Sequence, residues 1–259
     1  MIEQGLDNFT TLEEIVARLR APDGCPWDRK QTHASLKPYL IEEAYEVLQA
    51  LDEENSDKLC EELGDLLLQI MLHAQIAREA GKFEMRDVIR SIATKLIRRH
   101  PHVFGNSEAG TAEEVEQEWE LLKQDERREG DSLLSDVPRV MPALSYSHSI
   151  QRRVAGVGFD WKEFGGVLEK LAEEVQELER ASTAQQRIHE FGDILFSLVN
   201  VARWQDVNLE EALRLANERF YRRFEYMEEI CRQREVSLRE LSLDEQNALW
   251  EEAKRKLDF

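Results

Sequence analysis

The sequence predicts an all-α protein built from two tandem helical modules. Apolar residues recur at the three- and four-residue spacing of helices, as in Leu12, Val16 and Leu19, and segments that alternate like a strand are nearly absent. Helix-breaking residues are few, with 12 glycines and 6 prolines in 259 residues. The same series of motifs also occurs twice, in the same order along the chain.

The helices are expected between clusters of polar residues, glycine and proline. These clusters fall at residues 21–26, 53–57, 101–110, 128–142 and 155–160. The intervals between them have the length of ordinary helices. We predict an N-terminal module over residues 1–127, a linker over 128–150 and a C-terminal module over 151–259.

Five blocks make up the repeat: an approach segment, EExxE, ExxD, a basic pair four residues apart, and Trp-xxx-Lys. In the N-terminal half they begin at Cys25, Glu42, Glu62, Lys95 and Trp119. In the C-terminal half they begin at Gly158, Glu173, Glu190, Arg219 and Trp250. A Glu-rich chain can produce one such match by chance, but five in the same order indicate a duplicated module.

The composition limits the classes of partner. The chain has 53 acidic and 34 basic residues and a net charge of −19, which disfavours nucleic-acid polymers and anionic membranes. No window has the length and apolarity of a membrane span, and residues 1–10 do not resemble a signal peptide. The three cysteines, Cys25, Cys60 and Cys231, form neither a disulfide framework nor a zinc motif, so a reducing cytoplasmic location is expected.

Carboxylates three residues apart share one face of a helix. Glu174 therefore projects with Glu177, and Glu190 with Asp193. The second of these helices is apolar almost all round over residues 191–204, which predicts a buried helix. Its polar stripe consists of Glu190, Asp193, Ser197 and Asn200.

Buried carboxylates are costly unless a cation neutralises them. Mg²⁺ takes oxygen ligands of this kind and completes its shell with water and phosphate, and Mn²⁺ is a substitute. The N-terminal half offers a second metal site from Glu43, Glu46, Glu62 and Asp65. No histidine stands at a matching position in both halves, so we interpret His73 and His189 as surface or packing residues. A solvated acidic face is the alternative for each single motif.

Basic and aromatic residues four apart accompany both sets of carboxylates. Arg219 and Arg223, with Lys95 and Arg99 as counterparts, suit phosphate groups, although a surface basic strip fits the same spacing. Trp250 with Lys254, and Trp119 with Lys123, suit a nucleobase and its phosphates, or else a core tryptophan beside a partly buried lysine. Lys170 either binds phosphate or pairs with Glu174.

The order of these motifs resembles the MazG family of nucleoside triphosphate pyrophosphohydrolases, in its long, two-module form. The resemblance implies helical bundles completed by a homodimer, and Mg²⁺-dependent hydrolysis of nucleoside triphosphates, ATP among them, to nucleoside monophosphate and pyrophosphate. It implies that metal is held by Glu174, Glu177, Glu190 and Asp193. It implies that the nucleotide is bound by Lys170, Glu173, Glu174, Arg219, Arg223, Trp250 and Lys254. Glu173 is the candidate general base, because it lies outside this metal set.

Catalysis is expected in the C-terminal module. When the ExxD helices are aligned, Ser197 corresponds to Gln69 and Asn200 to Leu72, so the C-terminal stripe stays polar for one more turn. A broad nucleotide specificity is expected, and the alternatives are an enzyme narrow for one deoxynucleotide or damaged nucleotide, or a non-enzymatic acidic helical scaffold. The scaffold does not explain why carboxylates recur on the apolar helices.

Overall fold

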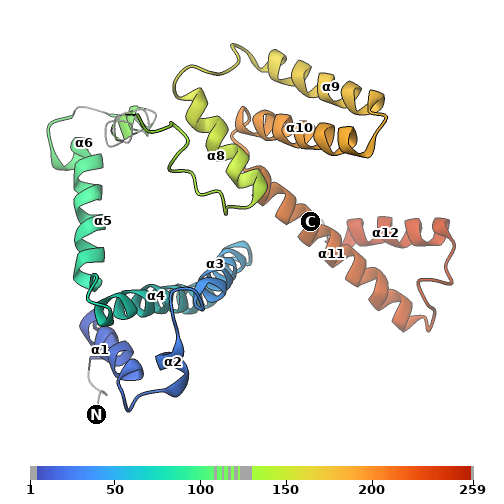
Figure 1. Cartoon of the computed structure of the whole chain (residues 1–259). Helices are drawn as coiled ribbons and strands as arrows, with labels where there is room; N and C mark the ends of the chain where they lie inside the picture. Colours follow the sequence, from blue (N-terminus) through green and yellow to red (C-terminus); the bar gives the residue numbers. More distant parts are fainter. Residues whose placement is uncertain are drawn as a thin grey trace. The chain divides into compact units, whose positions relative to one another are not determined.

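The computed structural model describes residues 5–107, 110–112, 114–115, 118–119, 122 and 130–257. Over these ranges the regular elements are all helices, which confirms the predicted all-α class (Figure 1). The chain divides into two compact units, residues 1–122 and 123–259. Within the described ranges, no helix combines the length and apolarity that a membrane crossing requires.

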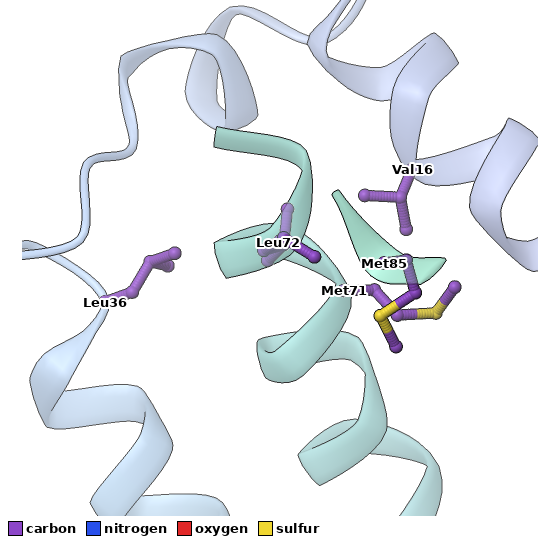
Figure 2. Packing of buried hydrophobic residues seen from close by; sticks show 6 residues of the cluster. Val16, Leu36, Met71, Leu72 and Met85 are labelled. Atoms are coloured by element: carbon purple, nitrogen blue, oxygen red, sulfur yellow. The ribbon is translucent and has the colours of Figure 1, made fainter. Parts of the chain in front are cut away.

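The N-terminal unit is organised around one pair of helices. Its elements are α1 (Phe9–Arg20), α2 (Pro26–Lys30), α3 (Lys37–Asp52), α4 (Ser56–Glu79), α5 (Met85–Arg99) and α6 (Pro101–Phe104). Helices α3 and α4 pack along each other, and α1 packs against α4 (Figure 1). The core of this unit joins α1, α4 and the starts of α3 and α5 through Val16, Leu36, Met71, Leu72, Ala74 and Met85 (Figure 2).

The C-terminal unit has a similar arrangement of its first helices. Its elements are α8 (Ala143–Ala155), α9 (Phe164–Arg180), α10 (Ala184–Arg203), α11 (Leu209–Gln233) and α12 (Leu243–Leu257). Helices α9 and α10 pack along each other and α8 packs on α10, where buried Gln151 donates to the carbonyl of Phe196 at 2.8 Å. Helices α11 and α12 form a second pair around Met227, Cys231 and Leu249.

Local capping fixes the register of both ExxD helices. Asn55 accepts a hydrogen bond from the backbone of Lys58 at the start of α4, and Thr183 forms a capping box with Gln186 at the start of α10. Each cap stands seven residues before the glutamate that begins the ExxD motif of its helix, Glu62 or Glu190. The two helices therefore present their carboxylates at the same depth from their N-termini.

Helix α10 differs from the prediction of a helix buried all round. Phe191 is 55% exposed and Leu195 is 49% exposed, while the buried residues are Ser197, Val199, Asn200 and Ala202. Helix α4 likewise leaves Leu63 49% exposed. The periodicity argument assumed that every apolar face finds a cover within the chain, but α8 and α9 cover only part of α10.

The predicted linker also differs from the observed organisation. Helix α8 begins at Ala143, within the stretch 128–150, and packs on α10. The C-terminal unit, residues 123–259, therefore includes the stretch predicted as a linker, and α8 supplies part of its packing. The predicted helix breaks agree closely elsewhere: α1 ends at Arg20, α3 ends at Asp52 and α8 ends at Ala155.

Two glycines occupy equivalent places in the middle of helices. Gly64 and Gly192 each precede the aspartate of an ExxD pair. Beyond its chain neighbours and the backbone of its own helix, a methyl group at either position would meet no atom within 4 Å among the residues that the structure describes. Glycine inside a helix costs about 1 kcal/mol relative to alanine, and the described packing of the single chain does not require it at either site.

Candidate active site

Helices α9 and α10 bring three of the predicted ligands into one group. Carboxylate oxygens of Glu174, Glu177 and Glu190 lie within 4.8 Å of one another. Glu174 is only 5% exposed, and Oε2 of Glu190 is buried without a hydrogen-bond partner among the described residues. Clustered carboxylates of this kind repel one another and are stabilised by a cation.

Asp193 belongs to a second group that shares Glu190 with the first. Ligand atoms of His189, Glu190 and Asp193 lie within 4.8 Å of one another, and Nδ1 of His189 is 2.8 Å from Oδ2 of Asp193. The four predicted ligands therefore meet in two overlapping groups. His189, which the sequence analysis interpreted as a surface or packing residue, has a side chain that is 72% exposed and stands beside Asp193.

Lys170 balances the charge of this site. Its Nζ lies 2.7 Å from Glu174 Oε1 and 3.2 Å from Glu173 Oε2. Hydrogen bonds to Glu174 and then to Glu173 raise the pKa of Lys170 to about 12, although partial desolvation opposes the shift. Of the two interpretations of Lys170, pairing with Glu174 is the one seen in the structure.

The donor atoms of the first group suit a hard divalent cation. All of them are carboxylate oxygens, and one of the contributing residues, Glu190, has a buried Oε2 atom without a hydrogen-bond partner among the described residues. Mg²⁺ accepts a few carboxylates and keeps several waters, so three converging side chains leave positions open for substrate oxygens. Glu173 does not belong to either group, and its Oε2 lies beside Lys170 Nζ.

The N-terminal unit contains a related group of carboxylates, whose charge is balanced by different neighbours. Glu43, Glu62 and Asp65 have ligand oxygens within 4.8 Å of one another. Burial raises the pKa of Glu43, and the neighbouring charges of Asp65 and Glu46 add to this effect. Burial also raises the pKa of Glu62, with further contributions from Glu46 and other acidic neighbours.

Gln69 stands beside Glu43 in this N-terminal group. Its Nε2 donates to Oε1 of Glu43 at 3.4 Å, and the residue is 6% exposed. Its own Oε1 has no hydrogen-bond partner within the described ranges. A neutral amide thus occupies the position that corresponds to Ser197 in α10.

Of the predicted nucleotide-binding residues, Lys170, Glu173 and Glu174 lie on α9 beside the carboxylate group, and the other four lie on the separate pair α11 and α12. The guanidinium of Arg223 on α11 lies 5.4 Å from the ring centroid of Trp250 on α12, and Phe220 packs on the same ring with centroids 5.2 Å apart. Trp250 is half-buried and packs against the Met227, Cys231 and Leu249 core, as the predicted alternative of a core tryptophan requires. Arg219 is exposed on α11, and Lys254 pairs with Glu251 at 2.6 Å.

The structure describes some of the N-terminal residues that correspond to this basic and aromatic set. Lys95 and Arg99 lie on α5, and the ring of Trp119 lies 5.3 Å from that of His100. Lys123 lies outside the described residues. The carboxylate group of this unit takes its members from α3 and α4, so the basic residues again belong to a different helix.

Two features define the class of protein: an all-helical chain, and paired helices that gather carboxylates into groups suited to binding a cation.

Residues 31–104 match the MazG nucleotide pyrophosphohydrolase domain family. The chain is 48% identical over 247 residues to the nucleoside triphosphate pyrophosphohydrolase/pyrophosphatase MazG of Thermotoga maritima, covering 95% of each protein. It is 42% identical to the nucleoside triphosphate pyrophosphohydrolase of Escherichia coli, covering 97% of this chain and 98% of that protein. It is 47% identical to YabN of Bacillus subtilis, an uncharacterized protein, over 95% of this chain and 51% of that protein. The chain belongs to the MazG family of pyrophosphohydrolases.

Proposed function

We propose that the chain hydrolyses nucleoside triphosphates to nucleoside monophosphates and pyrophosphate with Mg²⁺, at the C-terminal unit. The main support is the group formed by Glu174, Glu177 and Glu190, with a buried carboxylate oxygen that lacks a partner in the described structure. The names of the Thermotoga and Escherichia relatives support the same reaction. Glu174, Glu177, Glu190 and Asp193 would hold the metal.

The proposed reaction breaks the bond between the α-phosphorus and the oxygen that bridges it to the β-phosphorus. Water forms the new bond to the α-phosphorus, pyrophosphate leaves, and Glu173 accepts the proton of the water. The bound cation would supply neutralisation of phosphate charge. Arg219 and Arg223 bind the phosphates, and Trp250 stacks on the base. Stacking contacts the face of the base and does not use base-specific hydrogen bonds. This recognition supports broad specificity.

The C-terminal unit is the proposed catalytic unit because a lysine stands beside its EExxE carboxylates, at a position where the N-terminal unit has a tyrosine. Lys170 stands four residues before Glu174, whereas Tyr39 stands four residues before Glu43. The ring of Tyr39 packs edge-on against Trp27, with centroids 5.8 Å apart. When substrate arrives, Lys170 can transfer its hydrogen bond from a carboxylate to a phosphate oxygen, and Tyr39 cannot supply such a charge.

We further propose that the chain forms a homodimer through the uncovered faces of its helix pairs. On α9 and α10, Leu168 is 44% exposed, Val175 43%, Phe191 55% and Leu195 49%. Apolar residues that repeat along two adjacent helices favour a matching helix pair as cover, because this buries apolar surface on both sides. A second copy of the same chain offers such a pair.

The test is pyrophosphate release from a panel of ribo- and deoxynucleoside triphosphates, with Mg²⁺ or with EDTA. The matched variants are Asp193→Asn in α10 and Asp65→Asn in α4. We expect Mg²⁺-dependent release of monophosphate and pyrophosphate from several bases, lost in Asp193→Asn and retained in Asp65→Asn. Release from a single nucleotide would select the narrow enzyme, and no release from any nucleotide would contradict the proposed activity.

A further inference from the structure

Two of the predicted nucleotide-binding residues depend on how helix α12 lies on helix α11. Trp250 and Lys254 belong to α12, whereas Arg219 and Arg223 belong to α11. Helix α12 packs mainly along α11, and the two form a pair at the C-terminal end of the chain (Figure 1). The four side chains can meet one nucleotide only if α12 keeps a fixed rotation and register on α11.

The apolar contacts between these helices hold them together without fixing their register. The buried core of the pair is small and consists of Met227, Cys231 and Leu249. Apolar contact is not directional, and a methionine side chain adapts to shifts of its neighbours. A small slide of α12 would therefore keep most of the buried area and still move Trp250 away from Arg223.

A directional contact joins the two helices beside Trp250. The hydroxyl of Tyr226 on α11 donates a hydrogen bond to Oε1 of Glu252 on α12 at 2.9 Å, and both residues are half-buried. The guanidinium of Arg234 lies 3.9 Å from Oε2 of the same carboxylate. The bond to Glu252 and partial desolvation raise the pKa of the Tyr226 hydroxyl, so it stays protonated and remains the donor.

This hydrogen bond lies next to nucleotide-binding residues on both helices. Tyr226 follows Arg223 by three residues, which places the two on one face of α11. Glu252 stands between Trp250 and Lys254 on α12, two residues from each. The guanidinium of Arg223 lies 5.4 Å from the centroid of the Trp250 ring. An anchor within one turn of both residues fixes this separation.

The sequence places this pair in the C-terminal half alone. When the basic pairs and the Trp-xxx-Lys motifs of the two halves are aligned, Tyr226 corresponds to His102 and Glu252 to Leu121. A leucine side chain cannot accept a hydrogen bond. The contact is therefore a feature of the unit proposed to be catalytic, and the duplicated motifs do not require it.

We propose that Tyr226 is a positioning residue for nucleotide binding, which holds α12 in register on α11 through its hydrogen bond to Glu252. Tyr226 does not touch the nucleotide. It keeps Trp250 and Lys254 where they meet the base and the phosphates beside Arg223. The inference rests on the proposed function, because it takes these residues as part of the nucleotide-binding set. It adds a residue that acts on substrate affinity and not on the chemical step.

The test compares Tyr226→Phe with Tyr221→Phe, which makes the same change at a 63% exposed site on the same helix. Pyrophosphate release from ATP with Mg²⁺ gives KM and kcat. Calorimetry with an ATP analogue that has a methylene group in place of the α,β-bridging oxygen gives Kd without turnover. We expect Tyr226→Phe to raise KM and Kd by about three- to tenfold, as for one lost hydrogen bond, and to change kcat by less than about twofold. Tyr221→Phe should change none of the three.

Substitutions at Glu252 show whether the two residues act through their shared bond. Glu252→Gln keeps a side-chain oxygen that accepts the hydrogen bond, so its KM should stay within about twofold of the wild-type value. Glu252→Leu removes the acceptor and should match Tyr226→Phe. The double variant that combines Tyr226→Phe with Glu252→Leu should be no worse than either single one, because the bond can be lost only once.

The outcomes separate this inference from the proposed function. If Tyr226→Phe lowers the Tm but leaves KM and Kd unchanged, or if its effect adds to that of Glu252→Leu in the double variant, the inference is overturned. A loss in kcat at unchanged KM would overturn it as well. If the wild-type chain binds the analogue without turning over ATP, the proposed reaction is wrong and the Kd values alone decide the inference. If the wild-type chain does not bind the analogue, both are wrong.

Discussion

The carboxylate groups of the two units are built on similar helix pairs but differ in how their charge is balanced. In the C-terminal unit Lys170 contacts Glu174 and Glu173, and His189 contacts Asp193. In the N-terminal unit the amide of Gln69 contacts Glu43, and acidic neighbours raise the pKa values of Glu43 and Glu62. The comparison shows that a repeated EExxE and ExxD pattern fixes where carboxylates gather, while the residues around them decide what the group can do.

Among substitutions that distinguish the two carboxylate groups, the largest expected effect is on turnover. Glu174→Gln should lower kcat/KM for a nucleoside triphosphate by at least about a hundredfold, because a catalytic metal contributes several kcal/mol and 1.36 kcal/mol is tenfold in rate. The matched Glu43→Gln in α3 should change it by less than about twofold. Steady-state pyrophosphate release measures both. Equal losses in the two variants would place chemistry in both units.

The next effect is on stability, at the end of α10. Arg203 donates two hydrogen bonds to Asp160, at 2.6 and 2.8 Å, and its side chain is 14% exposed. Arg203→Met should lower the free energy of unfolding by about 2–3 kcal/mol, because the Asp160 carboxylate loses its charged partner and keeps only the neutral donors of Trp161 and Trp204. Urea denaturation at pH 7 tests this value.

The same pair has a defined acid dependence. Arg203 holds the pKa of Asp160 below its usual 3.8. A carboxyl with a lowered folded pKa adds stability above its unfolded value, and this stability is lost as the pH falls through the folded value. The difference between wild type and Arg203→Met should therefore shrink below about pH 4. A constant difference from pH 7 to pH 2 would contradict an ionic pair.

A smaller effect is expected from the lysine that only one unit possesses. The pKa of Lys170 is raised from 10.5 to about 12, so its pairing stabilises the fold below pH 10.5 and the contribution is lost as the pH approaches 12. Lys170→Met should cost less than about 1 kcal/mol at pH 7, since the side chain is 39% exposed and screened by water. The difference from wild type should vanish near pH 12. A matched Tyr39→Lys in α3 should lower the raised pKa of Glu43.

The smallest effect should be a gain in stability. The pKa of Glu43 lies above its usual 4.5, so its ionisation opposes folding as the pH rises through that raised value. Glu43→Gln cannot ionise and should raise the Tm at pH 7 by about 2 °C, with no gain at pH 4. Saturating Mg²⁺ should reduce the gain, because a cation bound to the wild-type group offsets the same repulsion. Calorimetry at the two pH values measures it.

Local rules predicted much of this molecule. The i, i+3 spacing correctly placed Glu174 with Glu177, and the breaker clusters located the ends of α1, α3 and α8. These features depend on neighbours a few residues away, which the sequence displays directly.

Long-range packing was not accessible in the same way. The bond between Arg203 and Asp160 joins residues 43 positions apart, and no periodicity indicates it. The exposure of Phe191 was also missed, because hydrophobic periodicity identifies an apolar face without identifying what covers it. Whether Lys170 points to Glu174 or elsewhere depends on a side-chain rotamer, which the spacing leaves open.

Gly64 and Gly192 bear on how the protein behaves on dilution. Each lowers the intrinsic stability of its helix by about 1 kcal/mol relative to alanine. The described packing of the single chain contains no close contact at either glycine that would explain this cost. If a second copy supplies the missing contact by a close approach of backbones, folding and association are one equilibrium. The melting temperature would then rise with protein concentration, and a strongly diluted sample would lose helical structure as it dissociates.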